Sequence, residues 1–232
     1  MPMVSTTDRA VIAICGMMLL AFWLYSQFAL LWIIHINCLI AAILFGYAIW
    51  KERETSRILE RSVLFGVVAS LTYIPLDWGL SHGIQFIIYL RSDLAVMPAA
   101  PLCVVFAWMI AITVIIYLYC RLNSMAAHAF VSAGIAGIAA FAGVIVIDQF
   151  ASAQFLWHWN STPLGGRYRV DFPQIGSTPV FVPVSLLLTF VLSPYYFYKR
   201  QHTIVAGIRC GVFMGTMLFC GFVVFLALYR DV

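Results

Sequence analysis

The sequence predicts an all-α integral membrane protein, a single polytopic domain over residues 1–232 with about seven transmembrane helices. Three observations lead to this fold class. Apolar residues make up 64% of the chain and charged residues only 9%, whereas soluble proteins carry about 25% charged residues. The mean hydropathy is +1.00. The apolar runs are roughly 20 residues long, which is the length that crosses about 30 Å of hydrocarbon.

Each predicted helix follows from one apolar run. Residues 10–50 are almost continuously apolar and hold two helices, joined by a tight turn near Tyr25–Trp32 where only Ser26 and Gln27 interrupt the pattern. The charged segment KERETSR separates the second helix from the third. The longest polar segment forms an outer loop over residues 149–177. The helices are expected near residues 10–29, 31–50, 62–81, 97–119, 126–148, 178–198 and 203–229.

The positive charges predict how these helices are oriented. An odd number of spans places the two termini on opposite sides of the membrane. Most Lys and Arg residues then fall on the side of the N-terminus, and an excess of Lys and Arg marks the cytoplasmic side. We therefore expect a prokaryotic cell membrane protein with a cytoplasmic N-terminus. The chain has no basic run that would fit nucleic acid.

Two carboxylates stand inside apolar sequence. Asp77 lies in TYIPLDWGLSHG and Asp148 in GVIVIDQF, and both are expected near the outer end of their helices. An ionisable residue within a span is a functional-site hypothesis by default, although a carboxylate near a helix end can also reach the headgroups. Pro75 breaks the backbone ladder beside Asp77, and broken helices at membrane depth usually line a cavity. We expect both carboxylates to face one outer cavity.

The residues around these acids give the rest of the predicted site. His82 follows Asp77 after a loosened turn, and His158 lies between Trp157 and Trp159 in the outer loop. No HxH, HxxxH or ExxH spacing supports a metal site, so no metal or other cofactor is expected. The aromatic residues of the outer loop can form the interfacial belt or line the mouth of a cavity. The predicted catalytic residues are Asp77, Asp148 and His82, and the predicted substrate-binding residues are Trp78, Trp157, His158 and Trp159.

Small residues predict close helix packing. Gly207, Gly211 and Gly215 recur every four residues in GIRCGVFMG, and such spacing supports tight helix contact in lipid. The contact lies either inside the bundle or with other membrane subunits.

A weak internal repeat relates the two acids. In each copy an intramembrane Asp precedes an aromatic connector and a helix opened by prolines. The first copy reads Asp77, GIQFIIYL, then MPAAPLCVVFAW; the second reads Asp148, FLWHWN, then STPVFVPVSLLLTF. The repeat would relate the third and fourth helices to the fifth and sixth across one outer pocket.

The motifs PLDWGLSHG, PLCVVFAW and IDQFASAQFLWHW resemble small polytopic carotenoid enzymes over about residues 62–198. These are the membrane lycopene cyclases of the heterodimeric type and the carotenoid hydratases of bacterioruberin synthesis. In that family an intramembrane acid is followed by an aromatic connector and a helix beginning with Pro-Leu. The cyclases place two glutamates directly after the proline, where this chain reads PAAPLCVV and PVFVPVS. Asp77 and Asp148 stand as possible substitutes for them.

The resemblance implies an enzyme that cyclises or hydrates an apolar isoprenoid-like lipid by acid initiation. Such chemistry needs a carboxylic acid that stays protonated in an apolar site and aromatic faces that stabilise a carbocation. Two other classes stay open. One is a non-catalytic subunit of a larger membrane complex of the monooxygenase or photosynthetic type, and the other is a proton- or cation-coupled transporter.

Overall fold

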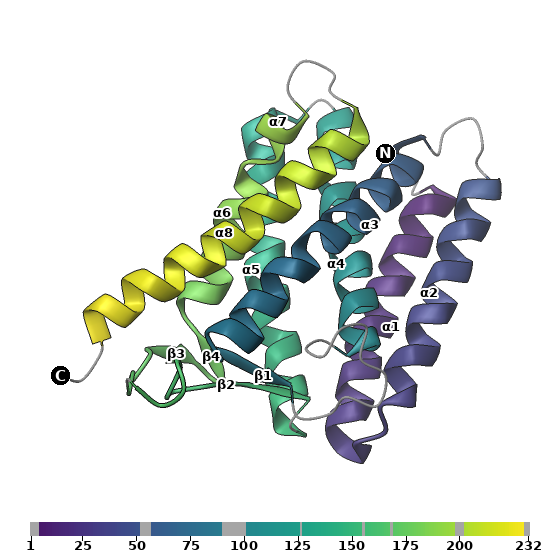
Figure 1. The fold of residues 1–232 in the computed structure, drawn as a ribbon. Helices are drawn as coiled ribbons and strands as arrows, with labels where there is room; N and C mark the ends of the chain where they lie inside the picture. Colours follow the sequence, from purple (N-terminus) through teal and green to yellow (C-terminus); the bar gives the residue numbers. More distant parts are fainter. Residues whose placement is uncertain are drawn as a thin grey trace.

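A computed structural model describes residues 5–51, 57–89, 101–125, 127–154, 156–167, 169–197 and 202–229 of the protein. The predicted all-α bundle is confirmed (Figure 1). In the part of the chain that the structure describes, six helices are long and apolar enough to cross a membrane. They are α1 (Thr6–Phe28), α2 (Trp32–Lys51), α3 (Arg57–Trp78), α4 (Leu102–Ser124), α5 (Ala129–Ala153) and α8 (Thr203–Tyr229).

The predicted span 178–198 differs from the other six. It forms two short helices, α6 (Phe181–Val191) and α7 (Ser193–Tyr196). Pro194 lies in the first turn of α7, and it favours a break from the preceding helix because it lacks a backbone N–H and restricts the residue before it. The Tyr196 hydroxyl donates to the Thr189 carbonyl at 2.9 Å and ties the two helices together.

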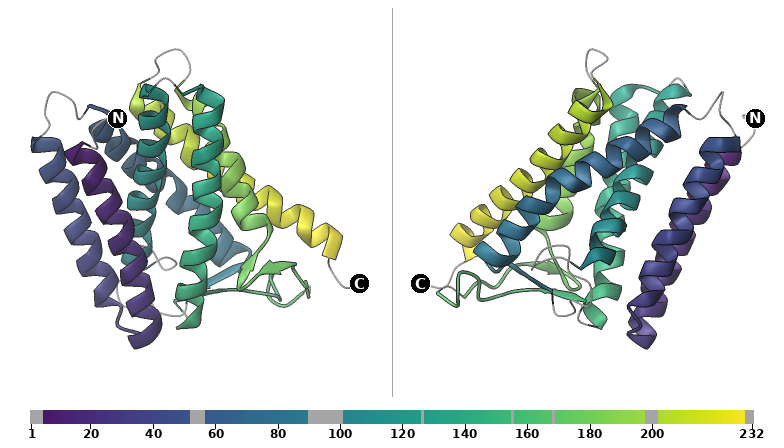
Figure 2. Two further views of the ribbon diagram at one scale, coloured as in Figure 1. Left: turned by 180° about the vertical axis from the view of Figure 1, so that it is seen from behind. Right: turned by 45° about the vertical axis from the view of Figure 1, so that its right-hand side comes forward.

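The helices run between two ends of the bundle. The N-terminus lies at the end where α2 and α4 finish and α3, α5 and α8 begin (Figures 1 and 2). The opposite end, which we call the strand end, holds four short strands and the finish of α8. The strands form two antiparallel pairs. One joins β1 (Ile87–Tyr89) to β2 (Trp157–Trp159), and the other joins β3 (Gln174–Ile175) to β4 (Thr178–Pro179).

The glycines of α8 pack inside the chain. Gly207, Gly211 and Gly215 all face α3, and a Cβ atom added at Gly207 would lie 3.0 Å from the Val68 side chain. One added at Gly211 would overlap the Ala69 carbonyl oxygen. Of the two alternatives left open by the sequence, the structure shows these three glycines packed inside the bundle against α3.

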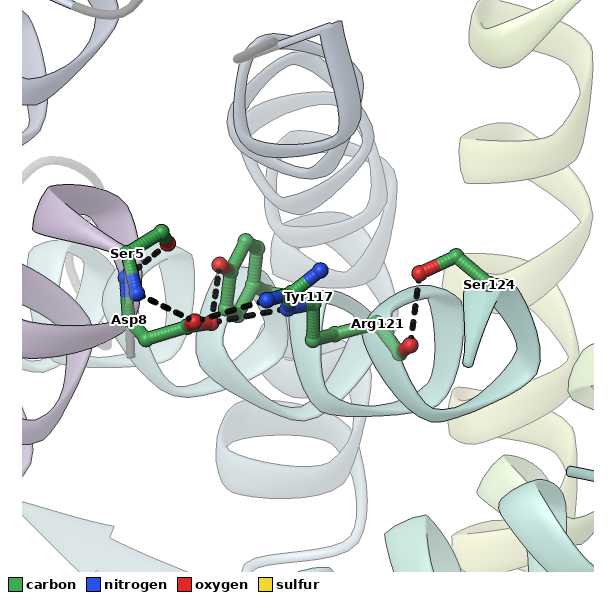
Figure 3. A network of polar contacts seen from close by, with 5 residues as sticks. All are labelled: Ser5, Asp8, Tyr117, Arg121 and Ser124. Carbon is green, nitrogen blue, oxygen red and sulfur yellow. Dashed lines mark hydrogen bonds and ion pairs between the residues drawn. The ribbon is translucent and has the colours of Figure 1, made fainter. Parts of the chain in front are cut away.

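The α1–α2 pair lies along one side of the bundle (Figure 2) and is fastened at both ends. At the N-terminal end, the Asp8 carboxylate accepts hydrogen bonds from Arg121 at 3.0 and 2.9 Å and from the Tyr117 hydroxyl at 2.7 Å (Figure 3). At the strand end, Gln154 accepts a hydrogen bond from the Tyr25 hydroxyl and donates one to the Ser26 carbonyl. Between these two ends, α1 makes apolar contacts, and its side chains form one wall of a cavity that α4 and α5 also line.

Candidate functional site

The bundle contains a cavity of about 360 Å³, which is within the range of roughly 300–1,000 Å³ that is usual for ligand sites. All the long helices except α2 contribute to its wall, together with α6 and the β1–β2 pair. Asp77 and Asp148 both line it. Asp77 is only 5% exposed and Asp148 is fully buried, so the structure brings the two predicted acids to one cavity.

The cavity follows α4 along much of its length. Its lining runs on that helix from Val104, near the strand end, to Leu118, which corresponds to about 21 Å at 1.5 Å per residue. On the side of α6 it extends from Val182 to Phe190. The carboxylates and the groups that bind them lie at the strand end, and the opposite half is lined by apolar side chains. The shape therefore fits a long apolar chain whose one end meets the two acids.

Asp77 is held by two phenols. Tyr73, one helical turn earlier on α3, donates to Oδ1 at 3.0 Å, and Tyr89 of β1 donates to Oδ2 at 2.9 Å. Burial and the nearby Asp77 charge raise the pKa of the Tyr89 phenol well above its ordinary value, so this group stays a proton donor. A carboxylate has about four acceptor positions, and Asp77 uses two of them on these phenols.

The backbone after Asp77 explains how Tyr89 reaches the Asp77 carboxylate. α3 continues through Pro75 to Trp78 and then widens into the π-helical segment η1 (Gly79–Gly83). Single-turn π-helical segments (π-bulges) in α-helices are frequent at functional sites. This segment turns the chain into β1 and so brings Tyr89 back onto the carboxylate.

Asp148 is held by four donors. The indole N–H of Trp157 donates to Oδ1. Oδ2 accepts the indole N–H of Trp159 at 2.9 Å, the Ser177 hydroxyl at 3.3 Å and the Thr178 hydroxyl. These donors match the number of acceptor positions on a carboxylate. Asp148 therefore serves as a fixed acceptor that orients two indoles, and it has less room than Asp77 to bind a ligand directly.

The β1–β2 ribbon joins the two acids. Tyr89, a donor to Asp77, lies directly opposite Trp157, a donor to Asp148, in the antiparallel register. Their ring centroids are 6.5 Å apart in an edge-to-face arrangement. Side chains alternate along a strand, so Trp157 and Trp159 share the face that lines the cavity. The two aromatic connectors of the predicted repeat are thus the two strands of one ribbon.

Three predicted site residues lie away from the cavity wall. His158 stands between the two tryptophans on β2 and therefore points to the other face of the ribbon. His82 is exposed, and its ring stacks on that of Trp78 at 5.8 Å. Trp78 is 44% exposed, because the residue after Asp77 is rotated by about 100° around the helix. The expectation that these three side chains meet a substrate in the cavity does not fit their positions.

Trp157 and Trp159 were expected in the site as substrate-binding residues, but the sequence analysis missed the four other donors to the acids: Tyr73, Tyr89, Ser177 and Thr178. Tyr73 lies four residues before Asp77, a spacing that places the two side chains on one helix face, and this signal was available. Tyr89, Ser177 and Thr178 come from segments whose approach depends on the strand pairing, and the sequence pattern gave no register. Within the described residues, no group of three or more His, Cys, Asp and Glu side chains could hold a metal ion.

Comparison with known proteins places residues 74–229 in one family model, described as Domain of unknown function (DUF6989). The matched region contains both acids, the β1–β2 ribbon and Thr178, whereas α1 and α2 lie outside it. No curated protein and no solved structure matches the chain.

Proposed function

The chain belongs to the family described as Domain of unknown function (DUF6989), and from its cavity we propose that it is an integral membrane enzyme acting on an isoprenoid-like lipid. The single observation that carries this proposal is that Asp77 and Asp148 line one end of a long apolar cavity. A purely apolar ligand would need no buried carboxylate, and burying one is expensive. The cost is understandable where the acid acts on the end of a bound chain.

Asp77 is the acid in this proposal. Its unused acceptor positions leave the carboxyl group able to carry a proton toward the cavity, and its two phenols hold it in place. Transfer of that proton to a carbon–carbon double bond uses the electron pair of the double bond and leaves a carbocation. In cyclisation the cation loses a proton after ring closure, and in hydration it takes up water, which releases one. Either step returns the proton that Asp77 supplied.

Asp148 and the aromatic side chains stabilise the positive charge. Trp108, Trp157 and Trp159 line the cavity, and aromatic faces attract cations by about 0.5–2 kcal/mol each. The negative charge of Asp148 acts through the same space, and its four donors keep it from moving onto the substrate. In this proposal Asp77 transfers the proton and Asp148 stabilises the charge.

Conversion of lycopene tests the proposal. A bacterial host that makes lycopene would express the wild-type protein, Asp77→Asn and, as a matched control, Ser62→Ala, which alters a buried α3 residue that does not line the cavity. We expect wild type and Ser62→Ala to yield a product of equal mass, for cyclisation, or one water heavier, for hydration. Asp77→Asn should accumulate to the same level and yield none. Unchanged lycopene with wild type, or product from Asp77→Asn, would contradict the proposal.

The second candidate is a non-catalytic subunit that holds a lipid or pigment within a larger membrane complex. The complete hydrogen bonding of Asp148 supports it, because a rigid polar cap also serves binding alone. This candidate predicts that wild type and Asp77→Asn retain the same unmodified lipid. A proton- or cation-coupled transporter has less support, since the far half of the described cavity lining offers an ion no polar side chain.

A further inference from the structure

The wall that α1 contributes to the cavity has an exposed edge. Cys15, Met18, Leu19 and Phe22 of α1 line the cavity. Leu19 is 43% exposed, and among the described lining residues it alone is exposed, whereas the others are buried or half-buried. Trp23, one turn later on the same side of α1, is exposed as well but does not line the cavity. Leu19 therefore lies where the cavity meets the outer surface of the bundle.

Leu19 belongs to a stripe of α1 that is fastened to the bundle at both ends. Asp8 lies eleven residues before Leu19 and Ser26 seven residues after it, spacings that place all three on one helix face. The Asp8 carboxylate binds Arg121 of α4, and the Ser26 carbonyl accepts a hydrogen bond from Gln154 of α5. The exposed edge at Leu19 thus lies between two points of attachment.

The opposite edge is formed by α5, which runs toward the strand end as α1 does (Figures 1 and 2). Ile147 and Gly143 lie seven and eleven residues before Gln154, the same distances that separate Leu19 and Cys15 from the α1 end of the hydrogen bond to Gln154. Both line the cavity and are half-buried. Gly143 has no side chain, and the space around its Cβ position is open. The two helices therefore leave a gap at this level.

The depth of the gap decides which environment it faces. α1 runs over 23 residues from Thr6 to Phe28, about 35 Å at 1.5 Å per residue, and the hydrocarbon core of a bilayer is about 30 Å thick. Residues 15–19 lie in the middle of this helix, so the gap faces lipid acyl chains and neither water nor headgroups. Half-buried apolar side chains of α4, such as Ala111 and Val114, also line the cavity at its middle.

We propose that the gap beside Leu19 and Gly143 is a lateral portal, through which an apolar lipid chain enters the cavity from the hydrocarbon core of the membrane. The inference rests on the proposed function for the identity of the lipid and adds the route by which it arrives. A chain that enters here stays out of water, where its apolar surface is unfavourable. It then reaches Asp77 and Asp148 by moving toward the strand end.

The test is the rate at which an apolar probe enters the cavity of the protein in phosphatidylcholine vesicles. The probe is diphenylhexatriene, a fluorescent polyene that partitions into bilayers and accepts energy transfer from tryptophan. Trp108 lines the cavity, so the decrease of the signal in Trp108→Phe identifies the part that comes from the cavity. The measurement requires binding alone and no turnover.

Substitutions at Leu19 should change the rate of entry in both directions. We expect Leu19→Phe to slow uptake and Leu19→Ala to accelerate it, each by about fivefold, which corresponds to a change of about 1 kcal/mol in the barrier. The final amount of bound probe should stay the same, because the portal controls passage and not the bound state. Leu20 is exposed on the same helix and does not line the cavity, so Leu20→Phe and Leu20→Ala are the matched controls and should leave the rate unchanged.

Unchanged rates in both Leu19 variants, equal changes in the Leu20 variants, or a change only in the final amount of bound probe would overturn the portal. A wild-type protein without a cavity signal would overturn it as well. Conversion of lycopene together with unchanged uptake rates would reject the portal alone. Altered uptake rates without conversion of lycopene would support the portal and reject the proposed enzyme.

Discussion

The two acids should respond differently when each is replaced by asparagine. Asn keeps the shape of Asp but presents one acceptor oxygen and one NH₂ donor. At position 148 the two carboxylate oxygens each accept from an indole N–H, which cannot act as an acceptor. In either orientation of the amide, the Asn NH₂ group therefore faces the N–H of Trp157 or Trp159. One buried donor loses its partner.

The magnitude follows from that unpaired donor. An unsatisfied buried donor costs about 1–3 kcal/mol, so we expect Asp148→Asn to lower the free energy of unfolding by about 2 kcal/mol. For a chain of about this size the melting temperature falls by roughly 2–4 °C per kcal/mol, which gives a decrease of about 4–8 °C. Intrinsic tryptophan fluorescence during heating in detergent measures it, since Trp157 and Trp159 bind the altered side chain.

Asp77→Asn is the matched control. Its two donors are the hydroxyls of Tyr73 and Tyr89, and a hydroxyl can rotate and accept from an amide NH₂ group. We expect a decrease of less than about 1 kcal/mol for this variant. Equal decreases for the two variants would refute the reasoning that the indoles make Asp148 intolerant of an amide.

Two further predictions concern packing and the attachment of α1, both measured by thermal unfolding in detergent. Gly211→Ala should destabilise the protein by about 1–3 kcal/mol because the new Cβ atom meets the Ala69 carbonyl. Gly46→Ala, the control, has open space around its Cβ atom and should stabilise the protein by about 0.5–1 kcal/mol. Equal effects of the two substitutions would contradict the α3–α8 contact. Arg121→Gln should cost about 1 kcal/mol, since its ion pair with Asp8 is partly exposed, and an unchanged melting temperature would show that the pair does not fasten α1 to α4.

The bundle could be predicted because hydrophobic length is a direct requirement of the bilayer. The turn between the first two helices lies at Ala29–Leu31, inside the expected stretch Tyr25–Trp32. The short α6 could not be foreseen from apolarity alone, since its residues are apolar except for Ser185 and Thr189. Pro194 was the available signal, because proline removes a backbone N–H and favours the end of a helix, although α3 continues through Pro75.

The candidate site was predictable in part. Asp77 and Asp148 stood out because charged residues are rare in apolar spans, and both line the cavity. Tyr73 could have been assigned from its spacing, but Tyr89, Trp157 and Trp159 depend on the register of two three-residue strands far apart in the chain. Ser177 and Thr178 reach Asp148 from a further segment. His158 illustrates the difficulty: without knowing that residues 157–159 form a strand, no pattern says that His158 points away from its neighbours.

The most direct test of the central claim, that the cavity holds an apolar lipid with one end at the acids, is the lipid extracted from the purified protein. Gly143 lines the cavity and has open space around its Cβ position, so Gly143→Phe places a ring inside the cavity. Gly46 also has open space but lies exposed on α2 and outside the cavity lining, so Gly46→Phe is the matched control. We expect mass spectrometry to find an isoprenoid-like lipid, near one per protein, in wild type and Gly46→Phe, and to find it lost from Gly143→Phe. Equal lipid in all three proteins, or none in wild type, would contradict the account.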